Sequence, residues 1–236
     1  MRSEVSTASR SGYPLAVNGV PLMPLPSGAL WWAEERTLLV ADLHLEKGSS
    51  HARRGALLPP YDTAATLAVL ARVIARLNPR CVVALGDSFH DRYAGERLHG
   101  ADVETIGALQ AGREWIWISG NHDPEIPGSV GGTRVSEIVM GPLVLRHEPR
   151  LGAPAGEIAG HLHPCARIVQ RGRSLRRRCF ALGGNNLVLP SFGALTGALN
   201  VRNQAFGSLM ARPDAQACLI GRDAVHKVQA TRLLAD

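Results

Sequence analysis

Four short clusters of Asp, Asn and His residues, each directly after an apolar run, carry the clearest chemistry in this sequence. In chain order they are Asp42 with His44, Asp87, Asn121 to Asp123, and His161 with His163. Carboxylate and imidazole groups both bind divalent metals such as Mn, Fe, Zn or Ni. An Asp that stands alone after its strand, as Asp87 does, can bridge two cations about 3.5 to 4 Å apart that hold a shared hydroxide. The pattern therefore predicts a two-metal hydrolytic site.

The apolar runs before these clusters predict the scaffold that positions them. Residues 37–41, 81–85 and 114–119 are short and rich in Leu, Val, Ile and Trp, which is typical of buried strands. The first loop residues after a buried strand lie at the carboxyl edge of the sheet, where strands far apart in sequence converge. We therefore expect the four clusters to meet there.

The rest of the chain predicts a βαβ-like first half and a mostly β second half. A helix is expected over about residues 63–77, capped by Asp62 and ended by Pro79, and a second over about 101–110. The expected strands cover 15–23 and 28–40, with turns at 26–28 and 35–36, and then 157–159, 166–170, 176–182, 186–189 and 217–221. A hairpin is expected from 135–140 and 143–146. Two packed sheets with helices outside would accommodate both halves.

Length and composition predict one domain. The chain has 236 residues, of which 45% are hydrophobic, so we expect a single domain over 13–236 after a flexible polar tail at 1–12. The tail lacks the apolar core of a signal peptide, and no run reaches the roughly 18 to 20 apolar residues of a membrane helix. We expect a soluble, cytoplasmic protein without a membrane partner. The four Cys residues lack metal or disulfide spacing, and Cys165, near His163, is expected to be structural like the others.

A fifth block strengthens the metal hypothesis. His147 follows the apolar run 143–145 and supplies another imidazole from the edge of the predicted hairpin. Taken singly, a strand-end Asp is most often a turn former, and a lone His is most often a surface or core residue. Chance is a poor explanation for D-x-H, GD, GNHD, H and GHxH in one chain, because the individual probabilities multiply.

This series of blocks resembles the calcineurin-like metallophosphoesterase superfamily, and the match runs across residues 42–163. The flanking segments ADLHLEKG, GDSFHD, GNHDP, GHLHP and LPSFGALTG are similar to the bacterial PdeM group, described as ligase-associated DNA damage response endonucleases. The resemblance implies an α/β fold, a four-layer α/β/β/α sandwich of two mixed sheets flanked by helices. It also implies two divalent metal ions, with Mn²⁺ expected and Fe, Zn or Ni as alternatives.

The resemblance further implies a role for each site residue. One metal would be held by Asp42, His44, Asp87 and His163, and the other by Asp87, Asn121, His147 and His161. A metal-bridging hydroxide would attack the phosphorus. His122 would face the phosphoryl group and either stabilise the developing charge or protonate the leaving oxygen, while Asp123 would orient the His122 ring.

Basic residues near the ligands are expected to select the substrate. The formal net charge is +6, and nearly all of the positive charge is Arg, which suits bidentate contact with phosphate. A biased composition explains the Arg content equally well, and a solvated surface or polar turn explains each position singly. The candidate substrate contacts are Lys47, Arg53, Arg54, His90, Arg173 and Arg177.

We therefore expect a dinuclear-metal phosphodiesterase, specifically a DNA endonuclease of DNA repair. Family analogy implies DNA-repair ligase and helicase partners, and the apolar segment 187–199 could form either core or a homodimer contact. Two alternatives remain at this point. One is a phosphodiesterase for small or cyclic nucleotides, and the other is a non-catalytic scaffold with the metallophosphoesterase fold.

Overall fold

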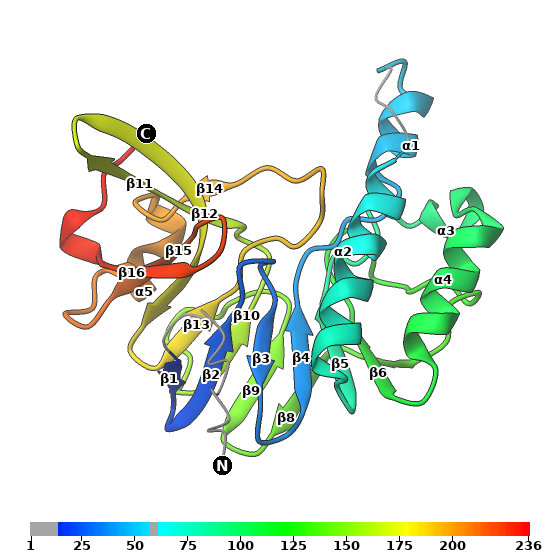
Figure 1. Ribbon diagram of the computed structural model, residues 1–236, viewed down its shortest axis with the longest axis horizontal. Helices are drawn as coiled ribbons and strands as arrows, with labels where there is room; N and C mark the ends of the chain where they lie inside the picture. The colour runs from blue at the N-terminus through cyan, green and yellow to red at the C-terminus, as the bar shows by residue number, and fades with distance from the viewer. Residues whose placement is uncertain (1–13, 57–60) are drawn as a thin grey trace, which may run out of the picture.

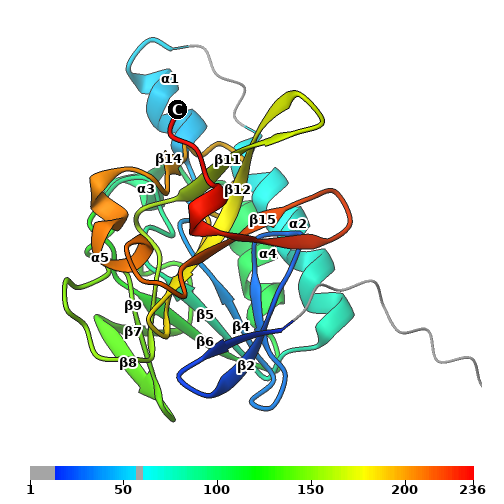
Figure 2. The same ribbon diagram turned by 90° about the vertical axis from the view of Figure 1, so that its left-hand side faces the viewer.

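Two β-sheets packed face to face, with helices on their outer faces, form the computed structural model of the protein (Figures 1 and 2). The structure describes residues 14–56 and 61–236. The tail predicted at 1–12 lies outside the described residues.

The first sheet contains the strands that lead into the first three clusters. Its strands are β1 (Leu15–Val17), β2 (Val20–Pro24), β3 (Leu30–Trp32), β4 (Thr37–Val40), β5 (Cys81–Leu85), β6 (Glu114–Ile118) and β7 (Thr133–Val135), in that spatial order. Pairing is antiparallel from β1 to β4 and parallel from β4 to β7. The turns expected at 26–28 and 35–36 are present, and a further turn at Asn18 and Gly19 divides 15–23 into two antiparallel strands. The parallel pairing places the carboxyl ends of β4, β5 and β6 at one edge.

The second sheet contains the strands that lead into His147, His161 and His163. Its strands are β8 (Glu137–Met140), β9 (Leu143–Arg146), β10 (Glu157–Ala159), β11 (Pro164–Gln170), β12 (Arg173–Gly183), β13 (Asn186–Val188), β14 (Leu199–Asn200), β15 (Gln216–Ile220) and β16 (Val225–Gln229). The order is β14-β11-β12-β13-β10-β9-β8, with β15 on β12 and β16 on β15. The hairpin predicted before His147 is β8–β9. Its predicted start was wrong, because Val135 pairs with Ile118 in the first sheet.

Helices cover the outer faces of both sheets. They are α1 (Lys47–Arg53), α2 (Asp62–Leu77), α3 (Ala94–Arg97), α4 (Gly100–Gln110) and α5 (Gly207–Met210), with 3₁₀ turns η1 (Gln204–Phe206) and η2 (Ala230–Arg232). In Figure 1, α2 and α4 stand beside the first sheet and α5 lies by the second. No helix in the described part of the chain is both long and apolar enough to cross a membrane.

Both predicted helices are present, but Asp62 has a different role from the one expected. It is the first residue of α2 rather than its cap, and its carboxylate accepts a hydrogen bond from the backbone N of Gly48 at 3.0 Å. Asp62 therefore ties α2 to α1. At the other end, Asn78 adopts a left-handed conformation with φ 43° and Pro79 follows, so the helix stops there.

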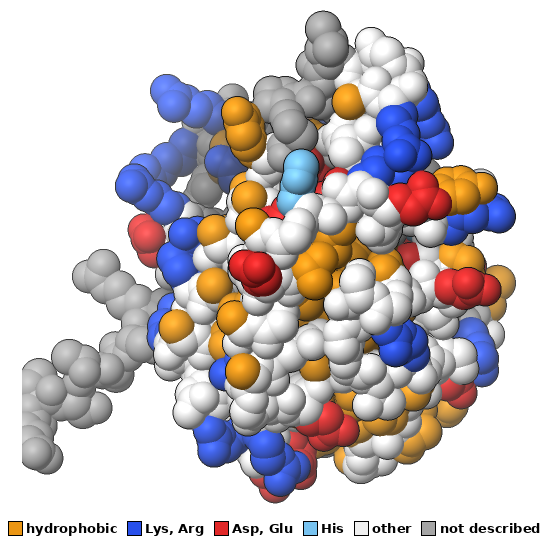
Figure 3. Space-filling model, turned by 90° about the vertical axis from the view of Figure 1, so that its right-hand side faces the viewer, with side chains coloured by type: hydrophobic (Ala, Val, Ile, Leu, Met, Phe, Trp, Pro, Cys, Tyr) orange, Lys and Arg blue, Asp and Glu red, His pale blue; other side chains and the backbone are white. Residues whose placement is uncertain are grey.

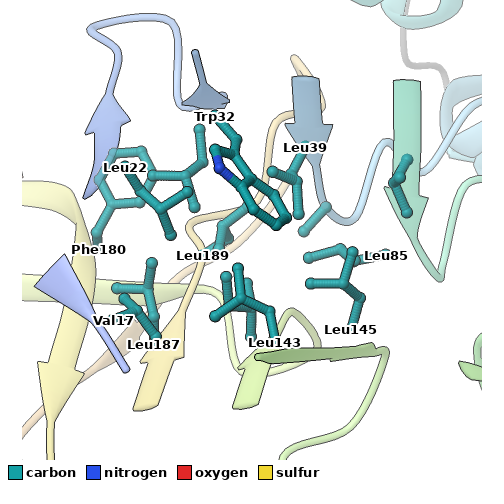
Figure 4. Packing of buried hydrophobic residues seen from close by; sticks show 14 of the residues in the cluster. Val17, Leu22, Trp32, Leu39, Leu85, Leu143, Leu145, Phe180, Leu187 and Leu189 are labelled. Carbon is teal, nitrogen blue, oxygen red and sulfur yellow. The ribbon is translucent and has the colours of Figure 1, made fainter. Parts of the chain in front are cut away.

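The largest core cluster lies between the two sheets. Trp32, Leu39 and Leu85 of the first sheet meet Leu145 and Phe180 of the second (Figure 4). A second cluster packs the other face of the first sheet against α2 and α4, and a third lies between the second sheet and α5. The four-layer α/β/β/α sandwich of mixed sheets is thereby confirmed. All four Cys thiols are free and buried.

Candidate metal centre

The predicted ligands converge where the two sheets meet. They come from the loops after β4, β5 and β6 of the first sheet and after β9 and β10 of the second. Within residues 14–56 and 61–236, three groups of side chains have potential ligand atoms within 4.8 Å of one another and could hold a metal ion: Asp42, His44 and His163; Asp87, His147 and His161; and His44, His90 and His122. The first two groups each combine residues from both sheets.

The backbone is unusual at five of these positions. Asp42, His44, Asp87, His161 and His163 have φ between 44° and 66°, a left-handed region that few residues other than glycine adopt. Such a conformation costs on the order of 1 to 3 kcal/mol and persists only where the surroundings impose it. Here, hydrogen bonds between the loop after β4 and the loop after β5 hold Asp42, His44 and Asp87 in this conformation. The backbone N of Asp42 donates to Gly86 O at 3.2 Å, and that of His44 donates to Asp87 O at 2.9 Å.

One half of the centre brings two imidazoles together with two carboxylates. The Nε2 atoms of His44 and His163 are 3.2 Å apart. His163 Nε2 lies 3.5 Å from Asp42 Oδ1, and His44 Nε2 lies 3.9 Å from Asp87 Oδ2. Burial lowers the pKa of His44 to about 3, although the Asp87 charge opposes the change. Neutral imidazole is the form that binds metals.

The other half of the centre is arranged around His147. Its Nδ1 lies 3.0 Å from Leu85 O, and because a carbonyl only accepts, Nδ1 carries a proton and Nε2 is the ring nitrogen that faces the centre. That Nε2 faces Asn121 Oδ1 at 2.9 Å, His161 Nδ1 at 3.1 Å and Asp87 Oδ2 at 3.4 Å. Imidazole nitrogens and carboxylate and amide oxygens that face one another at these distances are a ligand set that fits a divalent cation.

Asp87 is the side chain that the two halves share. Its Oδ2 faces both His44 and His147, and its Oδ1 accepts a hydrogen bond from the backbone N of His122 at 2.9 Å. Burial raises the pKa of Asp87, but the hydrogen bond and charge of His147 outweigh burial and lower it. Burial likewise lowers the pKa of His147, and the hydrogen bond and charge of Asp87 reverse that effect. This position is the one predicted for a bridging carboxylate.

Glycines make room for the ligands. A Cβ at Gly86 would lie 2.4 Å from the His147 ring, and one at Gly120 would lie 2.2 Å from Asp87 Oδ1. At Gly160 a Cβ would lie 2.8 Å from Asp42 Oδ2. Glycine is therefore required in the GD, GNHD and GHxH blocks, because a Cβ at these positions would clash with a predicted ligand residue.

His122 and Asp123 have separate functions. His122 is exposed, and its Nδ1 lies 2.9 Å from the carbonyl O of His90, so Nδ1–H donates and Nε2 is left free. Asp123 is buried, and its carboxylate accepts from the backbone N of Gly120 at 2.9 Å and of Phe89 at 3.0 Å. The orientation of the His122 ring by Asp123 stays a prediction, because the hydrogen bonds of the two side chains go to other partners. The His90 carbonyl orients the ring, while Asp123 joins the two loops, and burial raises its pKa to about 7.

The predicted substrate contacts occupy two separate places. Arg53 and Arg54 line a cavity of about 390 Å³ together with His122 and Asn121. His90 lies next to His122, with ring centroids 5.3 Å apart. Burial lowers the pKa of His90 to about 4, and the charge of Lys47 adds to this effect. These residues lie on the His122 side of the centre.

The two hairpin arginines lie elsewhere. Arg177 lines a different cavity, formed by the β11–β12 hairpin with β15 and β16. Arg173 is exposed at the start of β12. Figure 1 shows this hairpin and α1 at opposite sides of the molecule.

Sequence reasoning missed α1 and the residues that hold it. The segment Lys47–Arg53 has no apolar periodicity, so no local signal predicted a helix. The buried Glu46 precedes it, and its carboxylate accepts from Thr63 Oγ1 at 2.8 Å and Ser49 Oγ at 2.6 Å. Arg97 donates to both carboxylate oxygens of Asp91, at 3.0 and 2.8 Å, and to Ser49 Oγ at 2.9 Å.

The fold and the site define a metal-dependent phosphoesterase, and comparisons with known proteins agree. The family model described as calcineurin-like phosphoesterase matches residues 35–172. The chain therefore belongs to the calcineurin-like phosphoesterase family, whose members normally bind two divalent metals.

The chain is also similar to solved structures. The nuclease MPE of Pseudomonas putida has a TM-score of 0.69 and 32% identity, over 91% of this chain and 98% of that chain. The phosphoesterase Yfce of E. coli has a TM-score of 0.40 and 16% identity, over 82% and 98% of the two chains. A predicted phosphoesterase of Streptococcus pneumoniae has a TM-score of 0.33 and 14% identity, over 83% and 90%. No curated protein matches the sequence.

Proposed function

We propose that the protein is a two-metal phosphodiesterase that cleaves DNA. The observation that carries this proposal is the pair of His and Asp groups that share Asp87. In the proposal, one cation binds to Asp42, His44, Asp87 and His163. The other binds to Asp87, Asn121, His147 and His161. When bound, the two cations would lower the pKa of water and neutralise charge on the phosphate oxygens.

The side chains around the ligands fix their orientation. The Leu85 carbonyl sets the ring and tautomer of His147, which is a common arrangement for metal-binding histidines. The backbone N of His161 donates to both oxygens of Asp42, at 3.1 and 3.0 Å. These bonds hold the ligand atoms in place before a cation arrives, which lowers the reorganisation that binding requires.

His122 is proposed as the general acid. Its Nδ1–H is engaged by the His90 carbonyl, so a protonated His122 would present Nε2–H to the oxygen that leaves the phosphorus. An alkoxide leaving group needs that proton, because it is a strong base. Asp123 supports this role through the loop that carries His122, because its carboxylate holds the backbone of Gly120.

Two observations support DNA as the substrate. The structural neighbour with 32% identity is a nuclease, and Lys47, His90, Arg53 and Arg54 lie on the His122 side of the centre. Arg173 and Arg177 would meet only a strand long enough to extend to the hairpin. We further propose Mn²⁺ as the native metal and a cytoplasmic role in DNA repair beside ligase and helicase proteins, as the sequence resemblance implies.

The test uses purified protein with Mn²⁺ and three substrates: a labelled DNA oligonucleotide, a cyclic nucleotide and an aryl phosphodiester. Wild-type protein should cleave the oligonucleotide, and Asp87→Asn should abolish turnover. Asp223→Asn, which changes an exposed Asp outside the site, is the matched control and should keep full activity. Cleavage of small diesters without DNA would favour a small-nucleotide enzyme. Metal binding without hydrolysis of any substrate would favour a scaffold.

A further inference from the structure

Two hollows flank the candidate metal centre and meet at Asn121. The α1 hollow, of about 390 Å³, is lined by Arg53, Arg54, Asp91, Arg92, Tyr93 and Arg97 beside His122 and Asn121. The β9 hollow, of about 980 Å³, is lined by Glu137, Arg146, Glu148 and Arg150 beside His147 and Asn121. A DNA strand with its scissile phosphate at the metal centre would extend into one or both of these hollows.

The α1 hollow carries uncompensated positive charge. Its one lining carboxylate, Asp91, is engaged by both terminal nitrogens of Arg97. Arg53 lies 3.9 Å from Glu96, and both side chains are more than half exposed, so this pair contributes little. Arg54 and Arg92 form no ion pair with the residues that the structure describes. Three guanidinium groups therefore face the hollow without a firm partner.

The β9 hollow is electrically balanced. Arg146 pairs with Glu157 at 2.8 Å and with Glu137 at 2.9 Å, and Arg150 pairs with Glu137 at 3.0 Å. Glu148 adds a further carboxylate to the lining. A polyanion gains less there than in the α1 hollow, because the guanidinium groups are already paired.

The α1 hollow also has an exposed aromatic surface. Tyr93 is 53% exposed, although large aromatic side chains are usually buried. The guanidinium carbon of Arg92 lies 5.8 Å from the centroid of the Tyr93 ring. An aromatic ring beside an Arg is a surface on which nucleic-acid bases stack.

Arg97 holds the two sides of this hollow together. Its side chain is 7% exposed and joins Asp91, in the loop after β5, to Ser49 in α1. Arg53 and Arg54 at the end of α1 are thus held opposite Arg92 and Tyr93. On the face in Figure 3, Lys and Arg side chains stand in separate groups, at the upper left and upper right and along the sides and lower edge. The cationic groups are therefore positioned before any ligand binds.

We propose that the α1 hollow binds the DNA product strand that leaves with the oxygen protonated by His122. Arg53, Arg54 and Arg92 contact the backbone phosphate next to the scissile one, and Tyr93 packs on the adjoining nucleotide. Water adds across the P–O bond, so this product gains a hydroxyl while the phosphate stays on the other product. The inference rests on the proposed DNA phosphodiesterase function, and it makes these residues determinants of substrate choice.

The test compares the double variant Arg54→Ala/Arg92→Ala with wild-type protein in Mn²⁺. The substrates are a thymidine oligonucleotide and an aryl phosphodiester, which has no second phosphate. We expect kcat/KM for the oligonucleotide to fall about 100-fold, roughly tenfold for each charge-assisted hydrogen bond lost. Turnover of the aryl diester should stay within about twofold. The slope of log binding against log salt should fall by about 1, because Arg54 and Arg92 contact the same phosphate.

The matched control is Arg72→Ala/Arg76→Ala, which removes the same charge from exposed positions on α2. It should behave as wild type on both substrates. Full oligonucleotide activity in Arg54→Ala/Arg92→Ala, or an equal loss in the control, would overturn the inference while the phosphodiesterase proposal stands. Wild-type protein that hydrolyses the aryl diester but not the oligonucleotide would overturn the DNA proposal and this inference together.

Discussion

Replacing Gly120 with Ala is expected to damage both stability and metal binding. The added Cβ would lie 2.2 Å from Asp87 Oδ1, 2.3 Å from Asp87 N and 2.8 Å from Asp123 Oδ1, whereas ordinary contact begins at 3.4 Å. Asp87 N belongs to the turn after β5, and Asp87 O accepts from the backbone N of His44. The turn can retreat only if the Asp42–His44 loop moves with it.

The size of the effect follows from these contacts. Overpacking of a dense site costs about 1 to 3 kcal/mol, and occasionally more. One of the three short contacts at Gly120 is to backbone, which cannot rotate away, so we expect about 3 kcal/mol. Asp87 is shared by both halves of the centre, so its displacement should weaken Mn²⁺ binding roughly 10- to 100-fold, the range seen when the partners of metal ligands are altered.

Gly107→Ala is the matched control. Gly107 lies inside α4, and a Cβ added there would meet nothing within 4 Å, so Ala should stabilise the protein by up to about 1 kcal/mol. Urea unfolding in EDTA measures stability, and calorimetric titration measures Mn²⁺ affinity. If Gly120→Ala unfolds within about 0.5 kcal/mol of wild type, the scatter of ordinary surface substitutions, and binds Mn²⁺ equally well, the steric reasoning is refuted.

Three further predictions concern His122 as the general acid, the Arg97–Asp91 ion pair and the binding of Mn²⁺. His122→Ala should slow DNA cleavage about 10²- to 10⁴-fold but slow an aryl diester much less, because that leaving group is a weak base. Equal losses on both substrates would exclude a general acid. Burial raises the pKa of Asp91, but hydrogen bonds from Arg97, Ser50 and the Tyr93 backbone N, together with the Arg97 charge, outweigh burial and lower this pKa from 3.8 to about 2. The contribution of ionised Asp91 to the free energy of unfolding is therefore complete above about pH 4 and is lost as the pH falls through about 2. Asp91→Asn should cost about 2 kcal/mol at pH 6 and almost nothing at pH 2, as acid-series urea unfolding can measure. Free Mn²⁺ at about 100 times its Kd should stabilise wild type by about 2.7 kcal/mol per site, and Asp87→Asn should lose most of the thermal shift.

The sequence predicted the ligand-bearing strands well, and the reason is physical. Strands buried on both faces, such as Cys81–Leu85, read as continuous apolar runs, and the polar residues that follow must lie at the sheet edge. The same argument placed His147 at the end of a hairpin strand. Helix α2 was predictable because Leu67, Leu70 and Val73 share one face.

Features that depend on distant contacts were not predictable. The hydrogen bonds from Phe89 N and Gly120 N to Asp123 join residues 34 and 3 positions away, and nothing in the spacing distinguishes them from a bond to His122. The Arg97–Asp91 ion pair is tied to α1 by the hydrogen bond from Arg97 to Ser49, which is 48 residues from Arg97. Local periodicity carries no information about such pairs, so α1 and its supporting network emerged only with the fold.

Each half of the metal centre takes ligands from both sheets, and this has a consequence for how the site forms. Asp42 and Asp87 belong to loops of the first sheet, whereas His147 and His163 follow strands of the second. The separation of the ligand atoms is therefore set by the packing of the core between the sheets, where Leu145 lies two residues before His147 and is fully buried. A cation bound at either half would link the sheets directly, so metal binding and sheet packing should stabilise each other. The motifs specify the chemistry of each ligand, but the core between the sheets specifies the distances at which that chemistry operates.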